Sequence, residues 1–445
     1  MEQYRLSKYN HFLKKREKVT GVNLYNRRLF SIDRGKYDLL MSYKTDLSRL
    51  KEEQPVLFST MYKLGIIEDI TINIPNILLL KNRQQVFQNK TYRLFINPTL
   101  NCNFSCWYCY EQHNKKRMSS EVMNNTVKYI ENLITKEKIQ YLHIDWFGGE
   151  PLLCYKTVIK PISVEAQRIC EQNNVNFCMT MTTNGFLVKP EMISFFEEHK
   201  YIRFQITIDG DKESHNRTRF QGDSQNGSYD TIVNNIGLLT RLPNVRIVLR
   251  INFTREILSR CVHIIDCFPE ETRNKIQVDL VQVWQDSRQN KDSDWKDIWA
   301  NEKKIKNIFL DAGFVIPNRS FEHNKYHTCF ADLNNEAIIN YDGRVFKCTA
   351  VDFENEKEEG ILNNIGEIIW DEDALGKRLA KSPFDNKKCF KCDYLPICFG
   401  KCSTNYFIRK KMDNCILRPL LKGNLYEKMN IFNKSDYKIA YLHQI

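Results

Sequence analysis

The sequence predicts an α/β protein with a partial (β/α)6 TIM-like barrel and a small N-terminal α+β domain. The first observation is an alternation of strand-like runs with amphipathic helical segments, which begins at Tyr92. Such alternation is typical of right-handed βαβ units in a parallel sheet, and six units can curl into a partial barrel. The six strand-like runs are residues 92–98, 141–147, 176–183, 202–208, 246–253 and 276–283.

The second observation is that residues 1–90 lack this alternation. Apolar runs flank residues 24–28, which predicts a β-hairpin, and helical patterns follow through 37–50 and 55–67. These residues are therefore expected to form a compact unit of strands followed by helices. In the barrel, the first connecting helix should begin at Ser119 or Ser120, because its apolar residues recur at helical spacing: Met123, Val127, Ile130 and Ile134.

The composition indicates a globular protein. Hydrophobic residues make up 42% of the 445 residues, and no apolar run approaches the ~20 residues that a membrane helix needs. The N-terminus has no apolar signal segment, so we expect a cytoplasmic protein without a membrane partner. The net charge of +12 comes from Lys and Arg dispersed among acidic residues, which favours a solvated surface over a nucleic-acid interface. The 15 cysteines should stay reduced, and clustered cysteines are then expected to bind metal.

Three cysteines fall within eight positions directly after the first barrel strand, in "NCNFSCWYCYEQH": Cys102, Cys106 and Cys109. A zinc ion would need a fourth ligand, for which His113 is the only candidate nearby in the sequence. An iron–sulfur cluster accepts three protein ligands because a small molecule can bind the fourth iron, and Trp107 and Tyr108 would shield it from water. The spacing therefore favours an iron–sulfur cluster over zinc.

Three more motifs follow the next three strands: "FGGEP" at 147–151, "TTNG" at 182–185 and "TIDGD" at 207–211. Each alone is weak evidence, because Gly and Asn end many strands. Parallel sheets bind ligands at the carboxyl ends of their strands, so all four motifs should line one rim of the barrel. Their convergence predicts a binding site at that rim.

A second concentration of cysteines lies in the C-terminal region. Cys329 and Cys348 come first, and four residues separate Gly343 from Cys348. The run "CFKCDYLPICFGKC" then brings four thiols onto tight turns, and a further cysteine follows: Cys389, Cys392, Cys398, Cys402 and Cys415. This spacing is a strong metal signal, for which a zinc ribbon is the alternative to iron–sulfur clusters.

These patterns resemble a known family. "CNFSCWYC" is similar to the CxxxCxxC loop of radical S-adenosylmethionine (SAM) enzymes, and "GGEP", "TTNG" and "TIDG" resemble the segments with which that family contacts SAM. The C-terminal array resembles the seven-cysteine SPASM domain, which carries two auxiliary [4Fe–4S] clusters. The resemblance covers about residues 92–420. It implies a radical SAM partial barrel at 91–318, an iron–sulfur SPASM domain at 319–425 and a tail at 426–445. Residues 1–90 resemble, more loosely, the PqqD-like element that holds leader peptides, with a capping domain as the alternative.

The resemblance implies roles for the rim residues. Cys102, Cys106 and Cys109 would bind a catalytic [4Fe–4S] cluster and leave one iron for SAM, which is cleaved reductively to methionine and a 5′-deoxyadenosyl radical. Glu150 would accept a hydrogen bond from the SAM ammonium or hold the turn, and Arg250 would bind the SAM carboxylate or form a buried ion pair. Further SAM contacts are expected from Tyr108, Gly148, Gly149, Thr182, Thr183, Asn184, Thr207 and Asp209.

The SPASM resemblance also divides the C-terminal cysteines between two clusters. The nearer auxiliary cluster would use Cys329, Cys348 and Cys402, and the farther one Cys389, Cys392, Cys398 and Cys415. Some relatives have an eighth cysteine shortly before the first, which this sequence lacks. Either His323 or His327 takes its place, or the iron is open to a substrate group; two exposed loop histidines are the alternative.

The resemblance implies a maturase that abstracts hydrogen from a residue of a ribosomally made precursor peptide, giving a cross-link or another modification. Its partners would be the leader segment of that peptide and a reductant such as flavodoxin or ferredoxin. The first alternative is an anaerobic sulfatase-maturating enzyme, which forms formylglycine and carries an Asp directly after the cysteine of the Gly-x4-Cys element. Here that position is Thr349, and Asp352 lies three residues on. The sequence also leaves open an iron–sulfur electron-transfer or sensing protein that does not cleave SAM, and an RNA-modifying radical enzyme.

Overall fold

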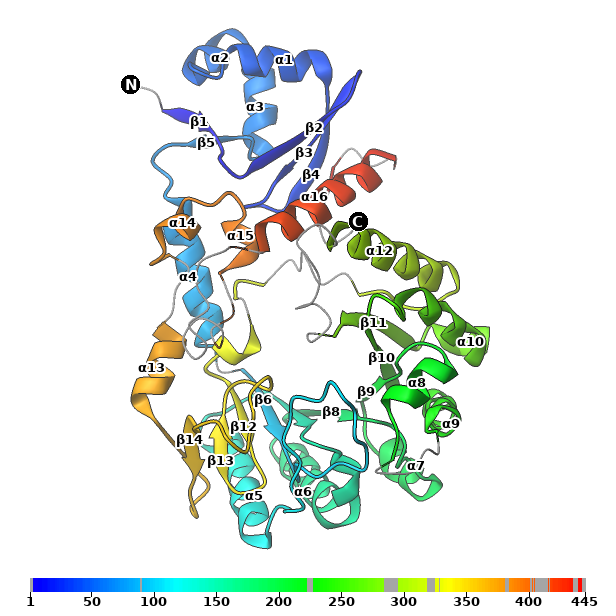
Figure 1. Cartoon of the computed structure of the whole chain (residues 1–445). Helices are drawn as coiled ribbons and strands as arrows, with labels where there is room; N and C mark the ends of the chain where they lie inside the picture. The colour runs from blue at the N-terminus through cyan, green and yellow to red at the C-terminus, as the bar shows by residue number, and fades with distance from the viewer. Residues whose placement is uncertain are drawn as a thin grey trace. The chain divides into compact units, whose positions relative to one another are not determined.

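The protein folds as two compact units in the computed structural model (Figure 1). The smaller unit comprises residues 1–88, 318–334 and 376–445, and the larger unit comprises 89–317 and 335–375. The structure describes residues 3–88, 90–221, 227–283, 295–317, 325–327, 329–380, 384–400, 402, 404, 415, 417–434 and 439–441.

The larger unit is built on a sheet of ten described strands. Six neighbouring strands are parallel and follow the chain order, which confirms the predicted barrel strands: β6 (Thr91–Ile96), β7 (Tyr141–Trp146), β8 (Asn176–Thr183), β9 (Ile202–Thr207), β10 (Val245–Phe253) and β11 (Ile276–Gln282). On the other side of β6 the sheet continues through a parallel strand and three antiparallel ones: β12 (Glu336–Ile339), β13 (Arg344–Phe346), β14 (Gly360–Leu362) and β15 (Ile368–Trp370).

Helices cover the outer side of this curved sheet, where α5, α6, α7 and α9 are seen in Figure 1. Strand residues on the covered face are buried and apolar, for example Leu94, Ile144 and Phe204. The alternate residues on the other face include polar, half-buried side chains, among them His143 and Gln205. The α-helices are α5 (Ser120–Thr135), α6 (Lys160–Gln172), α7 (Pro190–Glu197), α8 (Lys212–Thr218), α9 (Tyr229–Thr240), α10 (Glu270–Arg273) and α12 (Trp295–Asp311). The 3-10 helices are η1 (Pro151–Cys154), η3 (Leu258–Cys267) and η5 (Phe330–Asp332), and η2 (Tyr155–Ile159) is a π-helix.

Helix α5 begins where the sequence predicts. Ser119 is its N-cap and accepts a hydrogen bond from Val122 N at 3.2 Å, which satisfies one of the free N–H groups of the first turn. Ile130 and Ile134 are buried against the sheet side of the helix. The predicted apolar face therefore positions α5 and closes the first βαβ unit.

The smaller unit contains the predicted hairpin, because β3 (Lys18–Asn23) and β4 (Arg28–Asp33) pair antiparallel around the turn. A four-stranded sheet has the order β16-β4-β3-β2, and β1 pairs with β5; the other strands are β1 (Tyr4–Leu6), β2 (Asn10–Lys14), β5 (Ile67–Asp69) and β16 (Ile439–Tyr441). Apolar residues of strands and helices, including Phe30, Leu40 and Phe58, form one core cluster. The predicted helical stretches are α1 (Arg34–Ser42), α2 (Leu47–Glu53) and α3 (Pro55–Lys63).

C-terminal residues pack with this N-terminal sheet. Leu24 and Leu29 share a core cluster with Leu395 and Leu425. The helices of this part are α4 (Ile74–Val86), α14 (Lys387–Phe390), α15 (Leu395–Cys398) and α16 (Leu417–Lys434), while α13 (Glu372–Ala380) runs across the division between the units. Residues 335–375, by contrast, belong to the larger unit because β12 pairs with β6.

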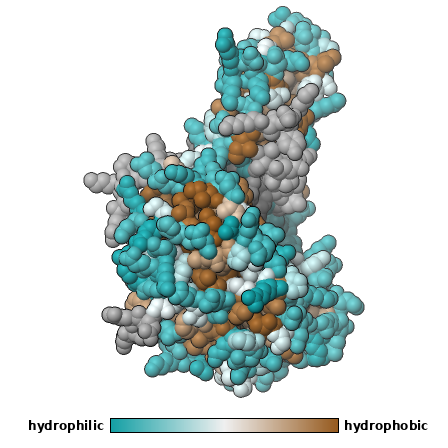
Figure 2. Space-filling view, turned by 90° about the vertical axis from the view of Figure 1, so that its right-hand side faces the viewer, coloured by the Kyte–Doolittle hydropathy of each residue, from teal (hydrophilic) through white to brown (hydrophobic). Residues whose placement is uncertain are grey.

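None of the described helices is long and apolar enough to cross a membrane. The face shown in Figure 2 is largely hydrophilic, with apolar areas between the polar residues.

Candidate active site

The three clustered cysteines lie in the long loop that follows β6. Cys102 and Cys106 are half-buried, Cys109 is exposed, and all three are free thiols. The loop turns tightly here, because Cys109 N donates to Cys106 O at 3.0 Å and Phe104 N donates to Cys102 Sγ at 3.4 Å. Three thiols are thus presented at the carboxyl end of the first barrel strand, as the sequence predicts.

The spacing of these thiols bears on the choice of metal. Thiolates that share one zinc at about 2.3 Å must lie about 4 Å from one another. Among the described residues, no three His, Cys, Asp or Glu side chains converge closely enough to hold a single metal ion. In an iron–sulfur cluster each cysteine binds a different iron, so the thiols lie farther apart. A set of three cysteine thiols, with one iron left for another ligand, suits such a cluster.

Burial makes these thiols weak acids in the absence of a cation. It raises the pKa of Cys102 to about 12, with the nearby Glu150 adding to the effect, and it also raises the pKa of Cys106. Metal ligands are thiolates, so positive charge must offset this burial for the loop to bind iron.

The glycines of "GGEP" pack directly against the backbone of the cysteine loop. A Cβ on Gly149 would lie 2.3 Å from Asn101 O and 2.4 Å from Leu100 O. Gly148 has φ +98°, and a Cβ there would lie 2.5 Å from Thr99 O. Gly149 N donates to Thr99 O at 3.2 Å. The missing Cβ therefore lets the glycine backbone approach and hydrogen-bond the backbone of the cysteine loop. Their predicted contact with SAM stays a prediction.

Glu150 joins two of the predicted rim motifs. Its buried carboxylate accepts hydrogen bonds from Leu152 N at 2.9 Å, Thr183 Oγ1 at 2.8 Å and Asn184 N at 2.8 Å. Asn184 in turn donates from Nδ2 to Asn103 Oδ1 at 2.8 Å, beside Cys102. The ends of β7 and β8 are thereby fixed to the cysteine loop, which is the turn-holding role that the sequence allows for Glu150.

A second polar group surrounds Tyr108, which precedes Cys109. Tyr108 Oη donates to Asp209 Oδ2 at 2.5 Å and accepts from Arg219 Nη1 at 2.6 Å and Asn252 Nδ2 at 3.2 Å. Arg250 Nε donates to Asn252 Oδ1 at 3.1 Å, which brings this predicted SAM contact into the same group. Thr207 is buried at the end of β9, and Thr182 is half-buried on the inner face of β8.

The sequence did not single out two members of this group, Arg219 and Asn252. Arg219 directly follows α8, in "NRTRF", and Asn252 lies two residues after Arg250 on β10. Neither stands in a motif of recognisable spacing. Strand alternation places Asn252 on the same inner face as Arg250, and this pattern could have identified Asn252 from the sequence.

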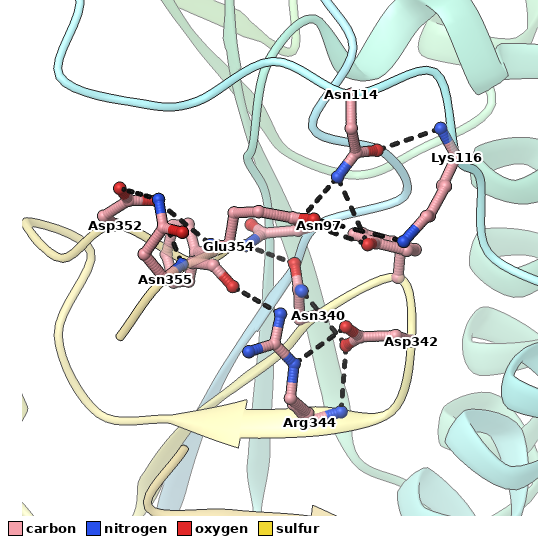
Figure 3. Close-up of polar contacts among 11 residues, drawn as sticks. Asn97, Asn114, Lys116, Asn340, Asp342, Arg344, Asp352, Glu354 and Asn355 are labelled. Carbon is pink, nitrogen blue, oxygen red and sulfur yellow. Dashed lines mark hydrogen bonds and ion pairs between the residues drawn. The ribbon is translucent and has the colours of Figure 1, made fainter. Parts of the chain in front are cut away.

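The segment after Cys348 contacts the cysteine loop within the larger unit (Figure 3). Tyr110 Oη donates to Thr349 O at 2.8 Å, and Asn114 Nδ2 donates to Glu354 Oε2 at 2.6 Å. At the base of this contact, buried Asn97 donates to Asn340 Oδ1 at 3.3 Å. Cys348 thus belongs to a segment that is hydrogen-bonded to the candidate catalytic loop.

Asp352 is engaged in its own turn. Its Oδ1 accepts from Glu354 N at 3.1 Å, and its Oδ2 accepts from Asn355 Nδ2 at 2.8 Å (Figure 3). The side chain that comes nearest in sequence to the sulfatase-maturase aspartate therefore holds a loop. Thr349, at the position itself, has no carboxylate.

The remaining candidate ligands are spread over both units. Cys348 lies in the larger unit, whereas Cys329 lies in the smaller one together with Cys389, Cys392, Cys398, Cys402 and Cys415. His327 Nδ1 donates to Gln85 Oε1 at 2.8 Å, and burial lowers its pKa to about 4. His323 lies outside the described residues. His113 Nδ1 donates to Leu100 O at 2.8 Å. The assignment of these residues to auxiliary clusters stays a prediction.

Comparison with known proteins supports the interpretation of the loop. Residues 96–280 match the Radical SAM superfamily. The chain is 24% identical over 378 residues to the radical SAM cyclopropyl synthase TigE of Paramaledivibacter caminithermalis, covering 74% of this chain and 73% of that protein. It is 30% identical over 135 residues to a cysteine-type anaerobic sulfatase-maturating enzyme of Clostridium perfringens, covering 28% of this chain and 35% of that enzyme. Streptococcus suis SuiB, solved with its precursor peptide SuiA, has a similar fold, with a TM-score of 0.53, 16% identity and coverage of 92% and 97%.

Proposed function

Because this chain is a radical SAM enzyme, with its radical SAM domain at residues 96–280, we propose that it modifies a ribosomally made precursor peptide. The modification begins with abstraction of hydrogen from one residue of the peptide and gives a cross-link or another product. The observation that carries the proposal is the contact between the cysteine loop and the Cys348 segment, through Tyr110 and Thr349. It supports a site in which an auxiliary cluster ligand lies close to the catalytic loop.

The residues of the rim have separate tasks in this proposal. When bound, the cluster and SAM supply the hydrogen-abstracting chemistry, and the protein holds and orients them. Cys102, Cys106 and Cys109 would hold the cluster, while Glu150 fixes the rim loops around it. Trp107 and Tyr110 are 53% and 40% exposed beside the thiols, where apolar parts of a peptide would pack.

We further propose three [4Fe–4S] clusters, a leader-binding role for residues 1–90 and a flavodoxin- or ferredoxin-type reductant. The nearer auxiliary cluster would use Cys329, Cys348 and Cys402, with its last position filled by His323, His327 or a substrate group. The farther cluster would use Cys389, Cys392, Cys398 and Cys415. The relative SuiB, solved with a precursor peptide, supports a peptide as the substrate class.

The first test is cleavage of SAM. Anaerobically reconstituted protein, given dithionite and SAM, is expected to form 5′-deoxyadenosine, detected by liquid chromatography and mass spectrometry. It should hold about twelve irons, and the variant with Cys102, Cys106 and Cys109 changed to Ala should hold about eight and form none. The control is Cys170→Ala, which removes a buried thiol outside the predicted clusters. Wild-type protein that holds iron but forms no 5′-deoxyadenosine would favour an electron-transfer or sensing protein.

Sulfatase maturation is the second candidate, favoured by the 30% identity to the C. perfringens enzyme. The turn made by Asp352 speaks against it. Incubating the enzyme with short peptides from neighbouring reading frames, and separately with a cysteine-containing sulfatase peptide, distinguishes the two. A mass change in the first set is expected. Formylglycine in the sulfatase peptide, with the others unchanged, would assign the second function.

A further inference from the structure

A buried cation lies against the cysteine loop. Arg219 is 7% exposed and donates from Nη1 to Tyr108 Oη at 2.6 Å. Its guanidinium carbon lies 5.7 Å from the centre of the Phe104 ring. Since residues 104 and 108 flank Cys106 in the sequence, Arg219 contacts the loop on both sides of a cluster cysteine.

The backbone next to Arg219 is held against the same loop. Ser105 N donates to Phe220 O at 3.3 Å, and an antiparallel bridge joins Phe104 to Gln221. Ser228 Oγ donates to Arg219 O at 2.8 Å. These contacts fix the backbone of Arg219 relative to the thiols.

The imidazole of His215, near Arg219, does not contribute a positive charge to this group. His215 Nδ1 accepts from Asp209 N at 3.2 Å, so the proton is on Nε2, which donates to Ser228 Oγ at 2.9 Å. Burial, and then the charge of Arg219, lowers the pKa of His215 well below its usual range. His215 is therefore neutral and serves to anchor the segment.

Arg219 stays protonated in this environment. Burial lowers the pKa of its guanidinium, but Tyr108, Cys106 and Asp209 together raise it well above the usual value. Asp209 lies across the phenol of Tyr108, and burial raises the pKa of its carboxyl although Arg219 lowers it. The guanidinium is the charged group that lies against both Phe104 and Tyr108 of the cysteine loop.

We infer that Arg219 is a positioning residue whose buried positive charge makes the iron–sulfur cluster at Cys102, Cys106 and Cys109 easier to reduce. Reduction adds one electron to the cluster, and a nearby fixed cation stabilises the more negative state. Salt screens such a buried charge weakly. The inference rests on the catalytic cluster of the proposed function and is independent of which peptide is modified.

The test is a redox titration of the reconstituted full-length protein with dithionite, followed by electron paramagnetic resonance. The catalytic cluster is identified as the signal that changes when SAM is added. Arg219→Gln and Arg219→Met remove the charge, and both are expected to lower the equilibrium constant for one-electron reduction about tenfold, which is about 59 mV. Arg219→Lys keeps the charge and should stay near the wild-type potential.

The matched control is Arg217→Gln, two residues away on α8, because Arg217 is exposed to solvent. It should leave the potential unchanged. The inference is overturned if a neutral Arg219 variant holds full iron and keeps the wild-type reduction potential. It is also overturned if the reduction potential of Arg219→Lys shifts as much as that of the neutral variants. If both neutral variants lose the cluster, the iron content of Arg219→Lys decides. Full iron in Arg219→Lys supports a role for the positive charge, whereas loss of iron in Arg219→Lys overturns the inference. None of these outcomes depends on peptide modification, so failure of the proposed substrate is seen separately.

Discussion

Gly149→Ala is expected to remove most of the iron held by Cys102, Cys106 and Cys109 and to abolish SAM cleavage. The added Cβ would lie 2.3 Å from Asn101 O and 2.4 Å from Leu100 O. Both atoms belong to the backbone, so no side-chain rotation relieves the overlap and the cysteine loop itself must move. We expect a loss of about 3 kcal/mol in unfolding free energy, because overpacking adds to the weakened hydrogen bonds of Gly149 N and Glu150 N.

The measurements are iron content per chain, 5′-deoxyadenosine formed with dithionite and SAM, and urea unfolding followed by circular dichroism. Gly237→Ala in α9 is the matched control, because a Cβ there meets nothing within 4 Å. Alanine is the better helix former, so this control should be neutral or more stable by up to about 1 kcal/mol. Wild-type iron content and stability in Gly149→Ala would contradict the packing argument.

The elements that position the site follow from local sequence patterns. The six parallel strands alternate with helices of regular spacing, and α5 begins at a serine cap. The cysteine loop, Glu150 and Asn184 follow directly from the ends of these strands. Topology then brings them to one rim, because the strands are parallel and neighbours in chain order.

Contacts between distant segments could not be predicted from the sequence in this way. β12 pairs with β6 although more than two hundred residues separate them, and no short motif encodes that register. Arg219 reaches Tyr108 only because the segment after α8 returns to the cysteine loop. The hydrogen-bond partners of Glu150 could not be predicted either. The sequence indicates a carboxylate at the turn, but not its three donors, which are Leu152, Thr183 and Asn184. Two of these donors lie at the end of the next strand.

Glu150→Gln is expected to destabilise the protein by about 2 to 4 kcal/mol and to lower its iron content. The carboxylate accepts three hydrogen bonds in a fully buried site. An amide has one oxygen, and its NH2 group would face a donor, which leaves at least one buried N–H unsatisfied at a cost of about 1–3 kcal/mol. The loop that carries Asn184 would then be held less firmly beside Cys102, through its hydrogen bond to Asn103.

Urea unfolding and iron content measure this effect. Glu131→Gln in α5 makes the same chemical change at an exposed position, and we expect it to stay within about 0.5 kcal/mol of the wild type. A Glu150→Gln protein as stable as that control would show that the three hydrogen bonds contribute little.

The effect of Glu150→Gln should also depend on pH. Burial is the main influence on Glu150 and raises the pKa of its carboxyl above the ordinary value of 4.5, although its three hydrogen bonds lower it. As pH rises, the unfolded chain loses this proton first, so stability that is present below the unfolded pKa is lost as pH rises through the folded pKa. Glutamine has no such proton. The stability difference between wild type and variant, measured from about pH 4.5 to pH 8, should therefore be largest at low pH and narrow as pH rises. A difference that widens with pH would mean that the hydrogen bonds outweigh burial at Glu150.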